Sequence, residues 1–185
     1  MIPAGGQRPT DLLLDLVTAN RDGRPVGLTS VCSANRFVIE TALLHAARGR
    51  GVVCIESTSN QVNQSGGYTG MTAAAFRDEV AALAAAAGVP AARVILGGDH
   101  LGPYPWRGLP AGEAMAQAHE LVRSCVLAGY GKIHLDASMR CADDPGGESA
   151  ALDDEVIVQR TVGLCSTAET ARAELPAGSA APLYV

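Results

Sequence analysis

An aspartate and a histidine stand side by side where a short apolar run ends. Segment 93–103 reads RVILGGDHLGP, so Asp99 and His100 directly follow a strand-like stretch and two glycines. A carboxylate beside an imidazole is suited to holding a divalent metal and moving a proton at a substrate hydroxyl. The same pair can also serve only to fix a loop by hydrogen bonding. Asp99 is therefore a candidate catalytic group, and His100 is a candidate metal ligand.

Polar side chains end three further apolar segments of similar length. Buried carboxylates are costly unless they have partners, so their recurrence at segment ends favours a functional site over simple packing. Glu56 and Asp136 are further candidate catalytic groups, and Ser30 and Ser138 are candidate substrate ligands. The segments are 26–34, 51–57 and 132–138, and their polar residues are Ser30, Cys32 and Ser33, then Glu56 and Ser57, then His134, Asp136 and Ser138.

Alternation along the strand predicts which side chains of 132–138 share a face. Ile133 and Leu135 would pack on helices, which leaves the polar side chains on the opposite face. His134 by itself nevertheless fits a satisfied core histidine better than a ligand. Lys132 precedes the strand and is expected at the opposite end from the polar cluster.

The geometry of the Asp-His pair depends on how its strand ends. In a regular strand Asp99 and His100 would face opposite sides, so both reach one site only if the chain turns at Asp99. Gly97 and Gly98, which precede the pair, allow a ligand or another backbone to approach closely.

A long polar loop, TSNQVNQSGGYTG, occupies residues 58–70. Amide side chains and open backbone N–H groups suit the hydroxyls and phosphate oxygens of a sugar phosphate. Asn60, Asn63, Gly66 and Gly67 are therefore candidate substrate ligands. A polar lid without any ligand role is an equally good interpretation.

The scaffold that must position these groups alternates between helix-like and strand-like segments. Residues 1–9 are expected to form a flexible leader, and 10–185 a single partial barrel whose first helix is capped by Thr10 or Asp11. Strand patterns fall at 26–34, 51–57, 93–98, 132–138 and 182–185, and helix patterns at 11–20, 36–48, 73–87 (with Thr72 as its cap), 112–129 and 153–174.

Alternating segments of this kind predict a parallel sheet with right-handed crossovers. A doubly wound sheet would need a glycine-rich turn after the first strand, where the sequence reads SVCSANRF. A barrel predicts polar groups at the carboxyl ends of several strands. Because four strands end this way, we predict an α/β fold, the N-terminal half of a (β/α)8 TIM barrel with parallel strands.

Composition narrows the partners and the compartment. The net charge of −5 without a basic stripe argues against nucleic acid, and no apolar run approaches the roughly 20 residues of a membrane span. The N-terminus has no signal-peptide pattern, so the cytoplasm is expected. Five cysteines without CxxC spacing predict buried free thiols: Cys32, Cys54, Cys125, Cys141 and Cys165.

Four contiguous motifs resemble the GatZ/KbaZ-like family, the Z-type subunit of class II D-tagatose-1,6-bisphosphate aldolase. They are SVCSAN, ESTSNQVNQSGGYTGMT, RVILGGDHLGP and KIHLDASMRCADDP, and the resemblance extends over 26–185 of a family whose members are more than twice as long. It implies a non-catalytic partner that supports the Y-type aldolase subunit in galactitol and N-acetylgalactosamine catabolism, with a ketose phosphate as substrate. A kinase label carried by some relatives gains no support, because the sequence contains no Walker motif.

The resemblance also implies roles for particular residues. Y-type aldolases carry a strand-end Asp-His pair in which the aspartate is catalytic and the histidine binds zinc, and Asp99 and His100 look like that pair. Asp136 is similar to a second carboxylate of such a site, whose later glutamate and histidine ligands would lie beyond Val185. Zn2+ or another divalent metal would then have an incomplete site in this chain.

Three functions remain open at this point. The first is support of an aldolase. The second is that of a metal-dependent fructose/tagatose 6-phosphate 4-epimerase in its own right, as described for other relatives. The third is that of a truncated remnant without independent activity.

Overall fold

Five parallel strands form one sheet in the computed structural model, and neighbouring strands follow the chain order β1-β2-β3-β4-β5. The structure describes residues 9–49, 51–146, 150–179 and 181–185, so nearly all of the expected leader lies outside the described residues. The strands are β1 (Ser30–Cys32), β2 (Val53–Thr58), β3 (Val94–Leu101), β4 (Lys132–Leu135) and β5 (Leu183–Tyr184).

Five helices alternate with these strands, and the first precedes β1. That helix begins at Pro9, so Thr10 and Asp11 lie in its first turn and not at the N-cap, because proline is well suited to the first helical position. Among the described residues, no helix is both long and apolar enough to cross a membrane. The helices are α1 (Pro9–Arg21), α2 (Arg36–Arg48), α3 (Ala73–Ala86), α4 (Ala111–Leu127) and α5 (Asp154–Ala173), with short 3-10 turns at Gly67–Thr69, Ala91–Arg93 and Tyr104–Trp106.

Side-chain caps fix where the outer helices begin. Asn35, Thr72 and Asp153 each accept hydrogen bonds from backbone N–H groups in the first turn of α2, α3 and α5. The cap of α4 comes from a distant loop, because the Asp143 carboxylate accepts the N–H of Ala111 at 2.6 Å. The Thr72 cap predicted from the sequence is confirmed.

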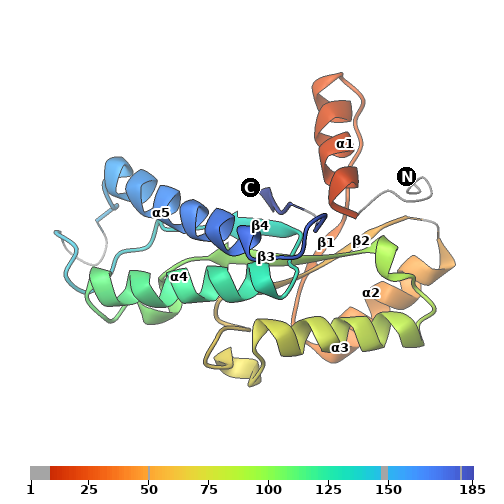
Figure 1. The fold of residues 1–185 in the computed structure, drawn as a ribbon, viewed down its shortest axis with the longest axis horizontal. Coiled ribbons are helices and arrows are strands. Elements are labelled where there is room, and N and C mark those ends of the chain that lie inside the picture. The colour runs from red at the N-terminus through yellow and green to blue at the C-terminus, as the bar shows by residue number, and fades with distance from the viewer. Residues whose placement is uncertain (1–8, 50, 147–149, 180) are drawn as a thin grey trace.

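All four helices from α2 to α5 pack on one face of the sheet, while α1 packs on the other (Figure 1). Strands in chain order whose connecting helices all lie on one face are typical of a sheet that curls into a barrel, whereas a doubly wound sheet reverses its strand order and has connecting helices on both faces. Helix α1 precedes the first strand and connects no two strands. The N-terminal half of a (β/α)8 barrel is therefore the observed architecture. The helical side of the core includes Ile39, Phe76, Leu121 and Leu164 with Val53, Ile55 and Ile133, and the α1 side contains Leu13, Cys54 and Ile95.

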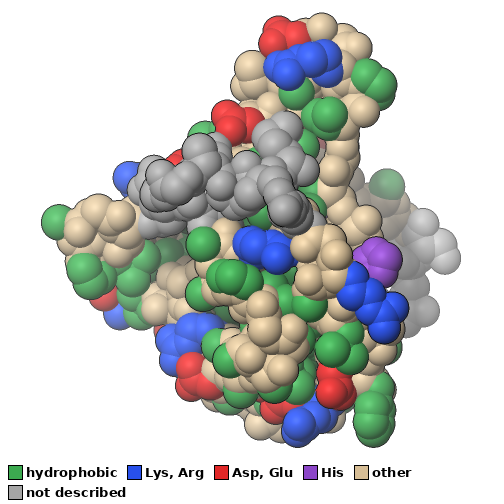
Figure 2. All heavy atoms as spheres, turned by 90° about the vertical axis from the view of Figure 1, so that its right-hand side faces the viewer, with side chains coloured by type: hydrophobic (Ala, Val, Ile, Leu, Met, Phe, Trp, Pro, Cys, Tyr) green, Lys and Arg blue, Asp and Glu red, His purple; other side chains and the backbone are tan. Residues whose placement is uncertain are grey.

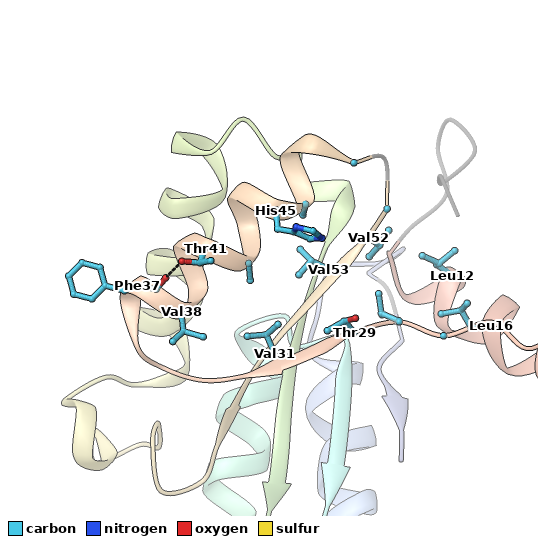
Figure 3. A pocket seen from close by; sticks show the side chains of 16 residues that line it. Leu12, Leu16, Thr29, Val31, Phe37, Val38, Thr41, His45, Val52 and Val53 are labelled. Atoms are coloured by element: carbon cyan, nitrogen blue, oxygen red, sulfur yellow. Dashed lines mark hydrogen bonds between the residues drawn. The ribbon is translucent and has the colours of Figure 1, made fainter.

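A groove of about 880 Å³ runs along the free edge of β1, between α1 and α2. Figure 3 shows Val31 and Val38 facing this space from β1 and α2, with Leu12 of α1 at its far side. Helix α1 stands out above the body of the chain (Figure 2). Because the groove is mostly apolar and none of the candidate catalytic or metal-binding residues lines it, it does not belong to the polar cluster.

Candidate functional site

A row of side chains crosses the face of the sheet that α1 also covers. The strand register aligns Cys32 of β1 with Glu56 of β2, Glu56 with Gly97 of β3, and Gly97 with Lys132 of β4. Residues two positions further along the strands, including Asp99, point to the same side. Cys32, Glu56 and Asp99 therefore share one face at the carboxyl end of the sheet. Ser57, the neighbour of Glu56, faces the helical side instead, where its hydroxyl lies 3.2 Å from that of Tyr130.

A β-bulge brings Asp99 and His100 to the same side. Gly98 pairs with Ile133 and Leu101 pairs with Leu135, so two residues of β3 lie opposite the single residue between the β4 partners. The backbone of His100 has a φ of 50°, a left-handed conformation that side chains rarely adopt. The turn that the sequence analysis required at the pair is thus present, one residue later than Asp99.

Asp99 is the central acceptor of the cluster. Its Oδ1 lies 2.8 Å from Nδ1 of His134, and its Oδ2 accepts a hydrogen bond from the Cys32 thiol at 3.2 Å. Burial alone would raise the pKa of Asp99, but the hydrogen bonds from His134 and Cys32 outweigh it and hold this pKa below its usual value. Asp99 is therefore ionised at neutral pH and can act as a ligand or as a base.

His100 is oriented by the second carboxylate. Its Nδ1 lies 2.8 Å from Oδ2 of Asp136, whose Oδ1 accepts hydrogen bonds from both the hydroxyl and the N–H of Ser138. The hydrogen bond with Asp136 raises the pKa of His100 above its usual value. Burial opposes the ionisation of Asp136, yet the bonds from His100 and Ser138 lower the pKa of Asp136 overall.

The donor set suits a divalent metal. Carboxylate oxygen of Asp99 and ring nitrogens of His100 and His134 lie within 4.8 Å of one another, and Zn2+ favours such nitrogen and oxygen ligands. The Asp136 contact to the other ring nitrogen of His100 follows the carboxylate–histidine–metal pattern, in which an outer carboxylate orients the ligand. In a second group, the Cys32 sulfur and carboxylate oxygens of Glu56 and Asp99 also lie within 4.8 Å of one another. Asp99 therefore belongs to both groups.

Glu56 lies one row deeper than Asp99 and has a cationic partner. Its Oε1 forms an ion pair with Lys132 Nζ at 2.5 Å and accepts a hydrogen bond from the Cys54 thiol at 3.5 Å. The expectation that Lys132 lies far from the polar cluster is wrong, because its side chain shares the inner face with His134 and Asp136. Ser30 begins β1 opposite Cys54, one row below Cys32, so it lies deeper than the rim where substrate ligands were expected.

The polar loop uses its own amides internally. Asn63 is buried, and it donates to the Ser59 carbonyl and accepts the N–H of Ser65 and of Gly67. The N–H of Gly66 binds the Asn63 carbonyl. Three of the four groups that were candidates for binding phosphate oxygens therefore have partners within the loop, which favours the interpretation as a polar lid. Only the Asn60 side chain has no such hydrogen bond among those described.

For two members of the cluster, the sequence pattern predicts a role in packing. His134 was interpreted as a core histidine, but its ring lies 4.4 Å from that of His100 and contacts Asp99. Cys32 was grouped with buried thiols, yet it is exposed, although all five cysteines are free as predicted. The two-residue alternation Lys132, His134, Asp136 was the available signal, because it places all three on one face.

Cys32 is expected to react slowly with thiol reagents despite its exposure. Partial burial of the sulfur, followed by the hydrogen bond to Asp99 and the charges of Asp99 and Glu56, raises its pKa to about 12. Since the thiolate is the nucleophile, we expect alkylation at pH 8 to be at least about 100-fold slower than for the unfolded chain. Mass spectrometry of iodoacetamide-treated protein measures this rate, and Asp99→Asn should accelerate it. Equal alkylation rates in the folded and unfolded chains would contradict the raised pKa of the Cys32 thiol.

The strand order, the placement of all connecting helices on one face and the polar rim define this molecule as a barrel-type α/β chain. A solved structure from Sinorhizobium meliloti 1021, described as a probable tagatose 6 phosphate kinase, has the same fold with a TM-score of 0.76. It is 45% identical in sequence, and the match covers 86% of this chain and 38% of that one.

The chain belongs to the family of D-tagatose-1,6-bisphosphate aldolase subunit GatZ/KbaZ-like proteins, whose profile matches residues 13–185. A D-tagatose-1,6-bisphosphate aldolase subunit GatZ from Klebsiella pneumoniae is 51% identical over 155 residues, which is 84% of this chain and 36% of the relative. A D-tagatose 6-phosphate 4-epimerase from Agrobacterium fabrum is 49% identical over 176 residues, which is 95% of this chain and 40% of the relative. The chain thus spans well under half the length of these relatives.

Proposed function

We propose that this chain is the N-terminal part of a Z-type subunit that supports a Y-type class II tagatose-bisphosphate aldolase in cytoplasmic ketose-phosphate catabolism. The observation that carries this proposal is the family match over 13–185 together with identities near 50% to GatZ aldolase subunits. Because these relatives are named as subunits of an aldolase, we infer that a partner subunit exists. Ketose phosphate is the substrate class of the assembly.

Co-purification with the aldolase tests this role. We expect the full-length protein that carries this chain to bind a Y-type aldolase and to lengthen its half-life on heating, because a ligand of the native state stabilises that state. Pull-down and residual aldolase activity after heating are the measurements. An aldolase that neither co-purifies nor gains stability would exclude the proposal.

A second candidate, metal-dependent 4-epimerisation of a ketose 6-phosphate, is favoured by the relative named as an epimerase and by the Asp99, His100 and His134 cluster. Asp99 and the two histidines would hold Zn2+ or another divalent cation. When bound, such a cation supplies Lewis-acid polarisation of substrate oxygens. Asp136 orients His100, and the ionised Asp99 would take a proton from the C4 hydroxyl with the carboxylate oxygen that does not bind the cation.

Incubation of the full-length protein with fructose 6-phosphate and a divalent metal tests the epimerase. The expected product is tagatose 6-phosphate, and Asp99→Asn should reduce its formation at least about 100-fold, the size of effect typical of a lost general base. Chromatographic separation of the two ketose phosphates measures the conversion. No product, or undiminished product with the variant, would exclude this function.

The third candidate, a remnant without independent activity, is favoured by the open edges of the sheet. Within the described residues β1 pairs only with β2 and β5 only with β4, and unpaired edges promote association between chains. We expect the 185-residue chain to self-associate or to melt at low temperature. Light scattering coupled to size-exclusion chromatography and a thermal melt measure this. A monomer with a cooperative, high-temperature transition would contradict it.

A further inference from the structure

Two groups of candidate metal ligands meet at Asp99, so the site offers two positions for one cation. On one side lie the rings of His100 and His134, and on the other lie Cys32 and Glu56. Both groups are compact enough to surround an ion. The two groups differ in the hydrogen bonds and ion pairs that their side chains already form.

The Cys32–Glu56 side already contains a positive charge. Lys132 Nζ lies 2.5 Å from Glu56 Oε1, and the two side chains are only 19% and 4% exposed. An ion pair this sheltered is stronger than one at the surface, and a buried carboxylate that loses its partner is costly. Lys132 therefore neutralises the deepest carboxylate of the cluster.

The pair forms across a strand that has no side chain in the way. Gly97 lies between Glu56 and Lys132 in the register, and a Cβ at this position would come within 2.7 Å of Glu56 Oε1 and 2.8 Å of its Cγ. The glycine thus provides the space through which Lys132 reaches Glu56. The Cys32 thiol also has a partner, because it donates a hydrogen bond to Asp99.

Among the residues that the structure describes, no Lys or Arg pairs with the histidine side in this way. The rings of His100 and His134 form hydrogen bonds with the carboxylates of Asp136 and Asp99, and they also contact each other. We propose that Lys132 acts as an internal cation that reserves Glu56, so that a divalent metal binds at Asp99, His100 and His134 and not at Cys32 and Glu56. Lys132 is in this sense a positioning residue that selects one of two metal positions. The inference rests on the metal site of the proposed epimerase function.

Cobalt titration of the 185-residue chain tests the proposal, because Co2+ bound to thiolate gives an intense near-ultraviolet charge-transfer band that nitrogen and oxygen ligands do not give. We expect the unaltered chain to bind one equivalent without this band. Lys132→Met frees Glu56 and should let Co2+ also occupy the Cys32–Glu56 position, which would be seen as the appearance of the thiolate band. Combining Lys132→Met with Cys32→Ser should abolish this band. Lys132→Arg keeps the positive charge and should behave like the unaltered chain.

Glu56→Gln gives an independent measurement if Lys132→Met does not fold, as judged by circular dichroism. The proposal predicts that its Co2+ affinity stays within about threefold of the unaltered chain, whereas loss of a true ligand would cost at least about tenfold. A thiolate band in the unaltered chain, or a tenfold loss in Glu56→Gln, would overturn the proposal. If Lys132→Met binds Co2+ but the unaltered chain does not, the proposed metal site is wrong and the role of Lys132 is retained. If neither the unaltered chain nor Lys132→Met binds Co2+, both the metal site and the role of Lys132 are wrong.

Discussion

Replacing Asp99 with asparagine is expected to lower the affinity of the chain for Zn2+ by about 100-fold or more. Asp99 is the only residue common to both candidate ligand groups, and its carboxylate contacts His134 and Cys32 directly. Loss of an outer-shell partner already costs roughly 10- to 100-fold in metal affinity, so loss of an inner carboxylate and its charge costs at least as much. Isothermal titration calorimetry measures the change.

Asp78→Asn is the matched control for this substitution. It removes the same charge from an exposed aspartate whose described ion pair is with its neighbour Arg77, and such surface pairs contribute little. We expect its Zn2+ affinity and its melting temperature to be those of the unaltered chain. Equal affinities of the Asp99 and Asp78 variants would show that the polar cluster is not the metal site.

Replacing Gly102 with alanine is expected to give the largest loss of stability. The new Cβ would lie 1.7 Å from the carbonyl oxygen of Asp136 and 2.8 Å from its carbonyl carbon, both backbone atoms that no rotamer change can move. At this point the end of β3 is joined to the segment after β4 by the hydrogen bond from the Asp136 N–H to the Leu101 carbonyl. Separating them should cost about 3 kcal/mol or more, which lowers the melting temperature by about 10 °C for a chain of this length.

Gly108→Ala is the control for the glycine substitution. A Cβ at Gly108 meets nothing within 4 Å, so its free energy of unfolding should change by less than about 0.5 kcal/mol. Thermal melts of both variants followed by circular dichroism make the comparison. If Gly102→Ala melts at the same temperature as Gly108→Ala, the close approach of β3 to the segment after β4 is wrong.

The fold was predictable because local signals and the global pattern agree. Short apolar strands alternate with helices, and Thr72 marks the start of one helix while Gly49 marks the end of another. The absence of a glycine-rich turn near Cys32 argues against a doubly wound sheet. The polar strand ends then pointed to a barrel rim. Strand lengths were less predictable, because β3 continues through Asp99 and His100 instead of ending before them.

The site was only partly predictable, for reasons that are physical. Periodicity gives the face of a side chain but not its reach, so the long Lys132 side chain was assigned to the wrong end although its neighbours on the same face were identified. The two-residue alternation of a strand does not reveal a β-bulge. The bulge nevertheless determines that the side chains of His100 and Asp99 lie on the same side of the sheet. Asn63 illustrates the opposite case, since a side chain suited to a ligand is used by its own loop.

The central claim is that a divalent cation binds at Asp99, His100 and His134. Locating the bound metal in a crystal tests this claim most directly. Crystals of the chain grown with Zn2+ and measured at the zinc absorption edge would give an anomalous difference map that shows the ion itself. We predict one strong peak about 2.0–2.2 Å from an Asp99 oxygen and a ring nitrogen of each histidine. A peak between Cys32 and Glu56, or no peak within the cluster, would contradict the account.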